Sequence, residues 1–316
     1  MRHQSKIKIS FIPIKIVYND CMDSKFETFL TVCETKKFTT AAKKLDLTQP
    51  AISSQIKQLE QEYDVKLFKR VNNEMILTPQ GEILYKYALR IQTLYNSLDR
   101  KLEDSKKHSR SLTIGITHTS ESNITPEILA DYSLKNKDSY IKIVSDTTQN
   151  LYEKLNTYQI DLAIIEGKIN KKHSSILLGT DSLVAVMSPK NQLANKEVIS
   201  IDDLKKEKLI VRTLESGTTS QFVNELEKNN LSLDDFQVYL EIDSVSSIKD
   251  LLKKNLGVSI LARSACAMEI DNKELVAVPL QNLDMIREIS LAYIDGNVDQ
   301  DVLDGISSIY KEKVIY

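Results

Sequence analysis

The chain has 316 residues, of which 41% are hydrophobic and 27% are charged, and it contains only 8 glycines and 6 prolines. This composition is typical of a soluble globular protein and argues against a disordered chain or an enzyme built on glycine-rich loops. The length exceeds one ordinary core, so we expect two or three domains, and no apolar run is long enough to span a membrane.

The net charge of −2 conceals an asymmetry along the chain. Residues 1–110 carry 20 Lys+Arg and 13 Asp+Glu, whereas the remainder carries 22 and 31. A basic N-terminal part on an acidic body fits a protein that contacts nucleic acid at one end, although such a split also arises by chance.

The cysteines Cys21, Cys33 and Cys266 are far apart and odd in number. This spacing argues against a disulfide framework or a zinc site and favours a reducing, cytoplasmic compartment. Residues 1–21 are basic and then apolar, but Pro13 and Lys15 interrupt the apolar part and no small-residue cleavage site follows. We therefore predict an N-terminal extension, with a signal peptide as the less favoured alternative.

Asp23–Thr35 is predicted to be the first helix, and Thr48–Gln61 (TQPAISSQIKQLEQ) has the pattern of an amphipathic helix. Thr48 is a good N-cap, and Pro50 in the first turn costs no intrahelical hydrogen bond. One face is apolar and is formed by Ala51, Ile52, Ile56 and Leu59. The opposite face offers groups that bond base edges and phosphates, namely Gln49, Ser53, Ser54, Lys57 and Gln58.

A second short helix is predicted at Thr39–Leu45, and Asp46-Leu47 reads as a tight turn. Two short helices joined in this way make a helix-turn-helix, whose second helix can enter a major groove. An ordinary helix pair with a solvated polar face is the competing interpretation. The small pair Ala41-Ala42, which would allow a close crossing, favours the DNA-binding one.

The stretch from Phe26 to Gly81 resembles the N-terminal domain of LysR-type transcriptional regulators, and weaker similarity continues to the C-terminus. The residues expected to contact DNA are Thr39, Thr48, Gln49, Pro50, Ser53, Ser54, Lys57 and Arg70. Arg70 belongs to a predicted wing, Tyr63–Thr78, with a turn at Asn72-Asn73. The resemblance implies that Arg70 reads the minor groove, while a solvated surface charge is the alternative for it and still more for Lys66.

A helix is predicted from Pro79 to about Lys106, followed by a polar hinge at Ser105–Ser111. Its apolar residues recur every one, three or four positions, at Ile83, Leu84, Tyr87, Ile91, Leu94, Leu98 and Leu102. An apolar stripe of this length on a helix between domains favours packing against a second subunit over packing against other parts of the same chain. The family resemblance implies that this linker helix dimerises, that tetramers form, and that the operator is pseudo-palindromic.

From Leu112 onward, short apolar strands alternate with helices, which predicts parallel sheets covered on both faces. The fold class is therefore α/β: a winged helix-turn-helix (22–80), a linker helix (81–111), and an effector domain (112–316). The resemblance implies the two-lobed fold of periplasmic binding proteins, with lobe I at 112–182 and 269–316 and lobe II at 183–268.

Four segments dense in Ser and Thr, at 117–122, 147–149, 215–221 and 243–247, follow strands or precede helices, where ligands bind in open α/β sheets. Each could be plain N-capping, but four together favour a pocket for a small anion or polar metabolite. The candidate residues are Thr117, Thr119, Ser120, Thr148, Ser216, Thr218, Thr219 and Ser244. The segment ITHTSE also resembles the cysteine-regulon activators of the LysR family, which implies roles for Thr117 and Thr119. Few cations lie near, apart from Arg212 and His118.

We therefore predict a transcriptional regulator that binds double-stranded DNA, a small effector and further copies of itself, with RNA polymerase as an additional candidate partner. No membrane partner, cofactor or metal is expected, because no catalytic or metal-binding motif is present. Two alternatives remain: a sensing protein whose N-terminal domain serves assembly only, and an enzyme using His118 as an acid or base.

Overall fold

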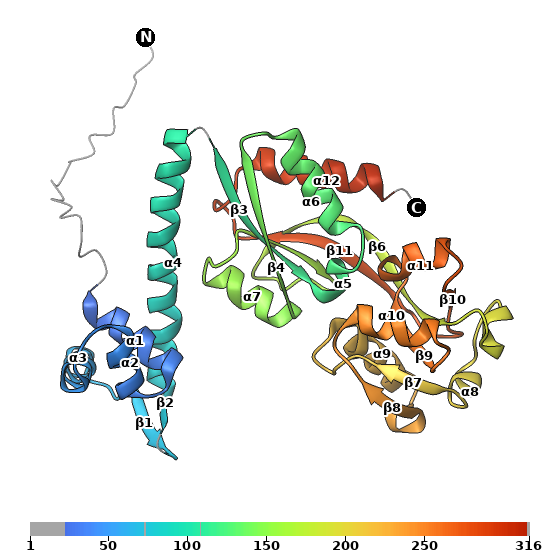
Figure 1. Cartoon of the computed structure of the whole chain (residues 1–316), viewed down its shortest axis with the longest axis horizontal. Coiled ribbons are helices and arrows are strands. Elements are labelled where there is room, and N and C mark those ends of the chain that lie inside the picture. The colour runs from blue at the N-terminus through green and yellow to red at the C-terminus, as the bar shows by residue number, and fades with distance from the viewer. Residues whose placement is uncertain (1–22, 73, 108, 315–316) are drawn as a thin grey trace, which may run out of the picture. The chain divides into compact units, whose positions relative to one another are not determined.

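The computed structural model describes residues 23–72, 74–107 and 109–314 (Figure 1). These residues divide into two compact units, one ending at Tyr95 and the other beginning at Asn96. The predicted extension, residues 1–21, lies outside the described residues. Within the described ranges, no helix combines the length and apolar character needed to cross a membrane.

The first unit consists of three helices, a two-stranded wing and the start of a long fourth helix. The elements are α1 (Ser24–Thr35), α2 (Phe38–Lys44), α3 (Gln49–Glu62), β1 (Phe68–Val71), β2 (Glu74–Leu77) and α4 (Pro79–Lys107). The predicted winged helix-turn-helix is thus confirmed. The Thr48 side chain accepts a hydrogen bond from the Ala51 amide and caps α3, and Asp46 takes the left-handed conformation, φ 53°, in the turn before it.

The apolar stripe of α3 packs into the core of this unit. Ile52, Ile56 and Leu59 are at most 4% exposed and belong to one cluster with Phe29 and Phe68. Gly81 allows α4 to start directly against this core, because a Cβ there would lie 2.2 Å from the carbonyl oxygen of Leu67.

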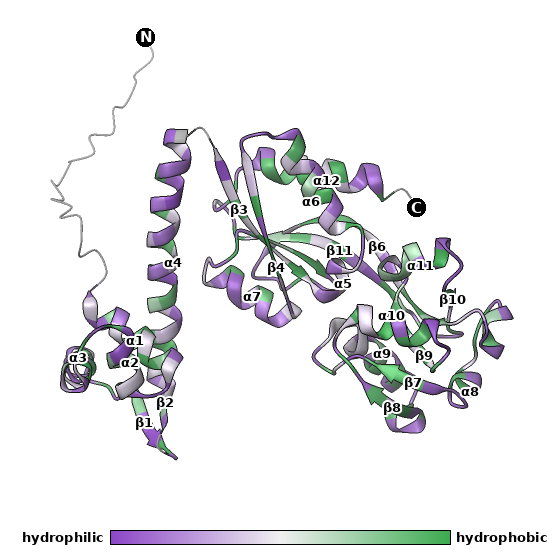
Figure 2. Cartoon of the chain, in the orientation of Figure 1, coloured by the Kyte–Doolittle hydropathy of each residue, from purple (hydrophilic) through white to green (hydrophobic). Residues whose placement is uncertain are grey.

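Helix α4 has two apolar faces. Leu84, Tyr85, Ala88 and Leu89 pack against the core of the first unit. The other predicted stripe residues are between 45% and 60% exposed, and they are Ile83, Tyr87, Ile91, Leu94, Leu98 and Leu102. Figure 2 shows the resulting mixture of green and purple along α4. The stripe was predicted to pack against a second subunit rather than against its own chain. Leu84 is the one predicted stripe residue that packs against the core of its own chain.

The second unit contains two lobes, each built on one part of a sheet. In lobe I the strand order is β4-β3-β5-β11-β6. Its strands are β3 (Arg110–Thr117), β4 (Ser139–Asp146), β5 (Leu162–Glu166), the first half of β6 (Ser174–Met187) and β11 (Ile286–Tyr293). Its helices are α5 (His118–Glu121), α6 (Thr125–Lys135), α7 (Thr148–Asn156) and α12 (Gln300–Lys313). Helices α6 and α12 share one core with the sheet, and α7 covers the opposite face.

Lobe II continues from the second half of β6 in the order β6-β9-β7-β8, with β10 also paired to β6. Its strands are β7 (Lys208–Val211), β8 (Gln237–Glu241), β9 (Val258–Ala262) and β10 (Val276–Val278). Its helices are α8 (Ile201–Leu204), α9 (Gly217–Lys228), α10 (Val245–Lys253) and α11 (Ala267–Asp271), with 3-10 turns η1 (Gln192–Asn195), η2 (Leu233–Asp235) and η3 (Ser264–Cys266). The faces of this sheet are covered by α9 and by α10.

The sheet is mixed, whereas the alternating pattern predicted parallel pairing throughout. Strand β3 is parallel to β4 and β5, and β7 is parallel to β8 and β9. However, β11 runs antiparallel to β5 and β6, and β6 runs antiparallel to β9 and β10. The first half of β6 escaped prediction because Gly179 and Asp181 interrupt its apolar run.

The lobe boundary also differs from the predicted one. Val278, Leu280 and Met285 belong to the core of lobe II, and β10 pairs with the second half of β6. The chain therefore returns to lobe I between Met285 and Ile289, which belongs to the core of lobe I, rather than at residue 269. A three-residue strand gives too little periodicity to reveal this from the sequence.

The segment predicted as a hinge is held by hydrogen bonds to the end of α4. The Asp104 carboxylate accepts from the Ser111 amide at 2.8 Å and from the Ser109 and Ser111 hydroxyls at 3.3 and 3.1 Å. One turn earlier, Arg100 Nη2 lies 3.4 Å from both carboxylate oxygens of Asp161, which directly precedes β5. The end of α4 is thus fastened to lobe I rather than freely jointed to it.

His173 makes the stability of lobe I sensitive to pH. Its ring is buried against Tyr152, with ring centroids 4.8 Å apart, and neither ring nitrogen has a hydrogen-bond partner among the described residues. Burial, and secondarily the charge of Lys172, lowers the pKa of His173 below its ordinary value. Below that ordinary value of about 6.5, the unfolded chain binds a proton that the folded protein resists, so stability falls as the pH falls.

We therefore expect His173→Phe to reduce the loss of melting temperature between pH 7 and pH 5. Phenylalanine keeps the stacking on Tyr152 but cannot bind a proton. Thermal unfolding of both proteins at each pH tests this, with His118→Phe, which removes a half-buried histidine of the same lobe, as the control. An unchanged pH dependence in His173→Phe would contradict the assignment.

Candidate nucleic-acid interface and ligand cleft

The outward face of α3 forms the candidate nucleic-acid interface. Because Ile52, Ile56 and Leu59 point into the core, the helical period directs residues 50, 54 and 57 to solvent. Of the eight residues predicted to contact DNA, Ser53 is half-buried. The other seven are exposed: Thr39, Thr48, Gln49, Pro50, Ser54, Lys57 and Arg70. Thr48 already serves as the helix cap.

The wing adds cations beside this face. Arg70 and Lys69 are exposed on β1, where Arg70 pairs with Met75 of β2. Lys66 is exposed and donates to the Glu60 carboxylate at 2.7 Å, which favours the alternative interpretation of Lys66 as a solvated surface charge. Amide and hydroxyl groups on the helix with cations on the wing provide partners for base edges and phosphates respectively.

In the second unit, three of the four hydroxyl-rich segments meet in a cleft between the lobes. Thr117 at the end of β3, Thr119 of α5 and Thr148 of α7 belong to lobe I, and together with Ser216 at the start of α9 in lobe II they surround one small cavity. The Thr119 and Thr218 hydroxyls lie 3.5 Å apart across the cleft. The remaining cavity is about 10 Å³, roughly the space of one water molecule, so the lobes are closed at this point.

The same cleft contains charged residues that the sequence did not indicate. Glu166, at the end of β5, accepts hydrogen bonds from the Thr117 and Ser120 hydroxyls at 2.6 and 2.5 Å. Arg287 of β11 is buried, and within the described residues its Nε and Nη2 have no hydrogen-bond partner. Its nearest carboxylate is Asp181, whose Oδ2 lies 3.7 Å from Nη2. From the sequence, Arg287 could have been identified as a candidate site residue because it is the only arginine in a largely apolar strand.

Arg212 connects the two lobes. Its Nη1 donates to the Thr119 hydroxyl at 3.3 Å, and its Nη2 donates to the Asp243 carboxylate at 2.8 Å. Thr219 donates to the backbone oxygen of Arg212 at 2.9 Å, and Ser216 caps α9. Thr218, Thr219 and Ser120 therefore support the cleft, whereas Thr117, Thr119, Thr148 and Ser216 line it.

Ser244 does not join this cleft, which corrects the prediction that all four segments converge. It caps α10 and lines a separate hollow of about 610 Å³ with His118, Glu121 and Asp243. Asp243, the residue before Ser244, lines the same hollow and is bound to Arg212 at 2.8 Å. His118 borders both spaces, with its Nδ1 3.5 Å from Glu121 and its Nε2 3.8 Å from Asp243.

Of the two cysteines in the described residues, Cys266 is buried and Cys33 is half-buried. Burial raises the pKa of Cys33 and of Cys266 to about 12, so both thiols stay protonated and unreactive. No cluster of three potential metal ligands occurs within the described ranges.

A winged helix-turn-helix followed by a long helix and a two-lobed domain with a polar cleft defines a ligand-responsive DNA-binding protein. Residues 105–302 match the LysR substrate binding domain, and residues 24–82 match the bacterial regulatory helix-turn-helix protein, lysR family. The chain belongs to the LysR family of transcriptional regulators, and its domains are those of regulators rather than enzymes.

Similar proteins share this organisation. An HTH-type transcriptional regulator of Methanocaldococcus jannaschii is 29% identical over 85% of this chain and 91% of its own. The HTH-type transcriptional regulator CysL of Bacillus subtilis is 28% identical over 84% of this chain and 88% of its own. The fold resembles the crystal structure of CbnR, a LysR family regulator, with a TM-score of 0.66 at 15% identity, covering 93% of this chain and 99% of that one.

Proposed function

We propose that this regulator reads DNA with the outward face of α3 and the wing, and that a small anionic metabolite in the cleft of the second unit controls it. The DNA-binding role rests on the exposure of Gln49, Ser54, Lys57 and Arg70 over a buried stripe. The proposal is supported by the likeness in fold to full-length CbnR, whose structure was determined in complex with its target DNA and matches at a TM-score of 0.66 over 92% of this chain and 99% of that one.

The exposed stripe of α4 supports assembly with a second copy of the chain. Six large apolar side chains that are about half exposed along one helix exceed what a solvated helix face needs. Pairing two such helices would bury these side chains and bring two α3 helices to two half-sites. The operator would then be pseudo-palindromic, and a further pairing would give a tetramer.

The observation that carries the ligand proposal is the buried Arg287. A buried guanidinium with two nitrogens lacking hydrogen-bond partners is costly. An anion in the cleft would receive charge-assisted hydrogen bonds from Arg287 and hydroxyl donors from Thr119 and Thr148. Glu166 already accepts two hydroxyl hydrogens, so its charge is partly compensated. These contacts favour a compact anion over a nucleotide.

The cleft also suggests how the signal arises. The cavity in this arrangement holds about one water molecule, so a metabolite that contacts Thr119 of lobe I and Ser216 of lobe II would bind an arrangement with the lobes further apart, and would shift the population toward it. This change in lobe separation would alter the geometry of a DNA-bound assembly, and thereby the access of RNA polymerase.

The experiment has two arms on the full-length chain. Selection of duplexes from a random pool should recover inverted repeats that bind an even number of protomers. Thermal-shift screening against sulfur metabolites, amino acids and small organic acids should give a hit that raises the melting temperature, and Arg287→Met should lose that shift. Recovery of unrelated duplexes would refute the DNA-binding part, and the cleft part would be refuted if every hit kept its shift in Arg287→Met.

A further inference from the structure

We propose a second ligand site, distinct from the cleft, at the place where β6 and β11 cross between the lobes; its ligand would be a small monocarboxylate with an apolar body. A cavity of about 340 Å³ lies there. This volume is at the lower end of the range for small-molecule sites and suits one ring or a short branched chain. The lining comes from both crossing strands, from the end of β9 and from α11.

The two sites have no lining residue in common, although they meet at the crossing strands. Ile286 and Arg287 are neighbours on β11, and their side chains alternate along the strand. Arg287 lines the cleft, whereas Ile286 and Asp181, the strand partner of Arg287, line the second cavity. A ligand in this cavity would therefore contact the same strands that carry Arg287 without entering the cleft.

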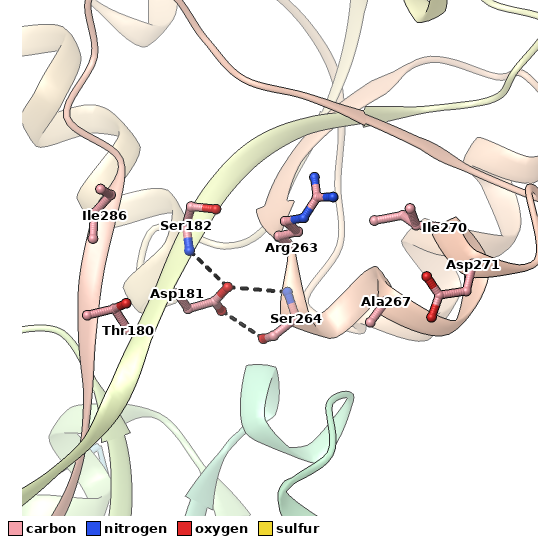
Figure 3. A pocket seen from close by; sticks show the side chains of 9 residues that line it. All are labelled: Thr180, Asp181, Ser182, Arg263, Ser264, Ala267, Ile270, Asp271 and Ile286. Carbon is pink, nitrogen blue, oxygen red and sulfur yellow. Dashed lines mark hydrogen bonds between the residues drawn. The ribbon is translucent and has the colours of Figure 1, made fainter. Parts of the chain in front are cut away.

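Arg263 provides the positive charge of this site. It follows β9, its side chain is exposed, and no hydrogen bond or ion pair of the described residues involves its guanidinium. Figure 3 shows Arg263 between Ile286 and Thr180 on one side and Ile270 and Asp271 on the other. A ligand carboxylate could thus be bound by Arg263 through paired hydrogen bonds.

The nearby carboxylates determine which anion fits. Asp181 is occupied: it accepts from the Ser264 hydroxyl at 2.7 Å and from the Ser182 and Ser264 amides at 2.9 and 3.2 Å (Figure 3). Asp271 lies at the far side and would repel a second negative charge. A dicarboxylate is therefore disfavoured, and a monocarboxylate remains.

The apolar part of the lining explains why the ligand should have a hydrophobic body. Ile286 is 65% exposed, and Ala267 and Ile270 of α11 complete an apolar wall beside Arg263. Covering these side chains with a ring removes apolar surface from water, which contributes roughly 25 cal/mol per Å². A free inorganic anion would bind Arg263 without this contribution.

The test uses 4-fluorobenzoate as the probe and its neutral counterpart 4-fluorobenzamide, with binding to the full-length chain measured by fluorine NMR. We expect Arg263→Gln to weaken binding of the carboxylate roughly ten-fold or more. Ala267→Phe, which fills the cavity, should abolish it. Lys254→Gln, which removes an exposed cation elsewhere in lobe II, should leave it unchanged.

Arg287→Met separates the two sites. Retention of probe binding in this variant supports the second site, whereas its loss would place the probe in the cleft and overturn the proposal. Equal binding of acid and amide, unchanged binding in Arg263→Gln, or no binding by the unmodified protein at millimolar probe would each overturn it as well. Apart from loss of probe binding in Arg287→Met, which would support ligand binding by the cleft, these outcomes do not bear on the cleft proposal.

Discussion

Alanine at both Gln49 and Ser53 is expected to lower the affinity for a selected duplex by about 100-fold, because each good base contact contributes about 1–3 kcal/mol. Both residues lie in the N-terminal half of α3, the part of a recognition helix that reaches base edges. Affinity for unrelated duplexes should change little, because it depends on phosphate contacts. Fluorescence anisotropy with both duplexes at two salt concentrations measures the difference.

Two further substitutions make this result specific. Lys57→Ala should weaken binding to both duplexes and reduce the salt dependence by about one phosphate contact. Gln61→Ala removes an exposed glutamine from the same helix, about 18 Å along its axis from Gln49, and should have no effect. If the double variant retained its preference for the selected duplex, the first unit would serve assembly rather than recognition.

Removing the carboxylate of Asp161 is expected to destabilise the second unit by about 2–3 kcal/mol and to lower its melting temperature by about 5–10 °C. This side chain is 6% exposed and accepts from the Thr113 amide at 2.7 Å. Asp161→Ala would leave that buried amide without its partner and would release Arg100. Since Arg100 is one-third exposed and 3.4 Å away, its ion pair contributes less than a fully buried pair would.

The isosteric variant separates the two contributions. Asp161→Asn keeps an acceptor for the Thr113 amide but loses the charge, so we expect it to lose about half as much stability. Asp295→Ala, at an exposed aspartate of the same lobe, serves as the control. Thermal unfolding followed by circular dichroism reports all three, and equal stability of Asp161→Ala and Asp295→Ala would show that the end of α4 is not fastened through Asp161.

The Asp161→Asn variant also tests how ligand binding in the cleft is transmitted through lobe I to affect DNA affinity. If Arg100 and Asp161 hold the end of α4 in a fixed orientation, a weakened contact should uncouple ligand binding from DNA affinity. In Asp161→Asn, a ligand that binds the cleft should still raise the melting temperature but should change DNA affinity less than it does in the unmodified protein.

The sequence alone determined the elements whose patterns are local. The stripe of Ile52, Ile56 and Leu59, the cap at Thr48 and the proline at position 50 are sufficient to define α3 and its outward face. The same holds for β3 and β5, whose runs of apolar residues are buried on both faces. In these cases the backbone hydrogen bonds and the burial both follow from residues close in sequence.

Only the tertiary structure decided which distant side chains share a site. Arg287 and Glu166 enter the cleft because β11 inserts antiparallel between β5 and β6, a pairing across more than one hundred residues that leaves no periodic signal. Ser244 was included in the predicted pocket because of its hydroxyl and its position after a strand, yet it lines a separate hollow. Local sequence fixes helices, strands and caps through short-range sterics and hydrogen bonds, whereas the meeting of charges depends on strand order, which the packing of the whole domain selects.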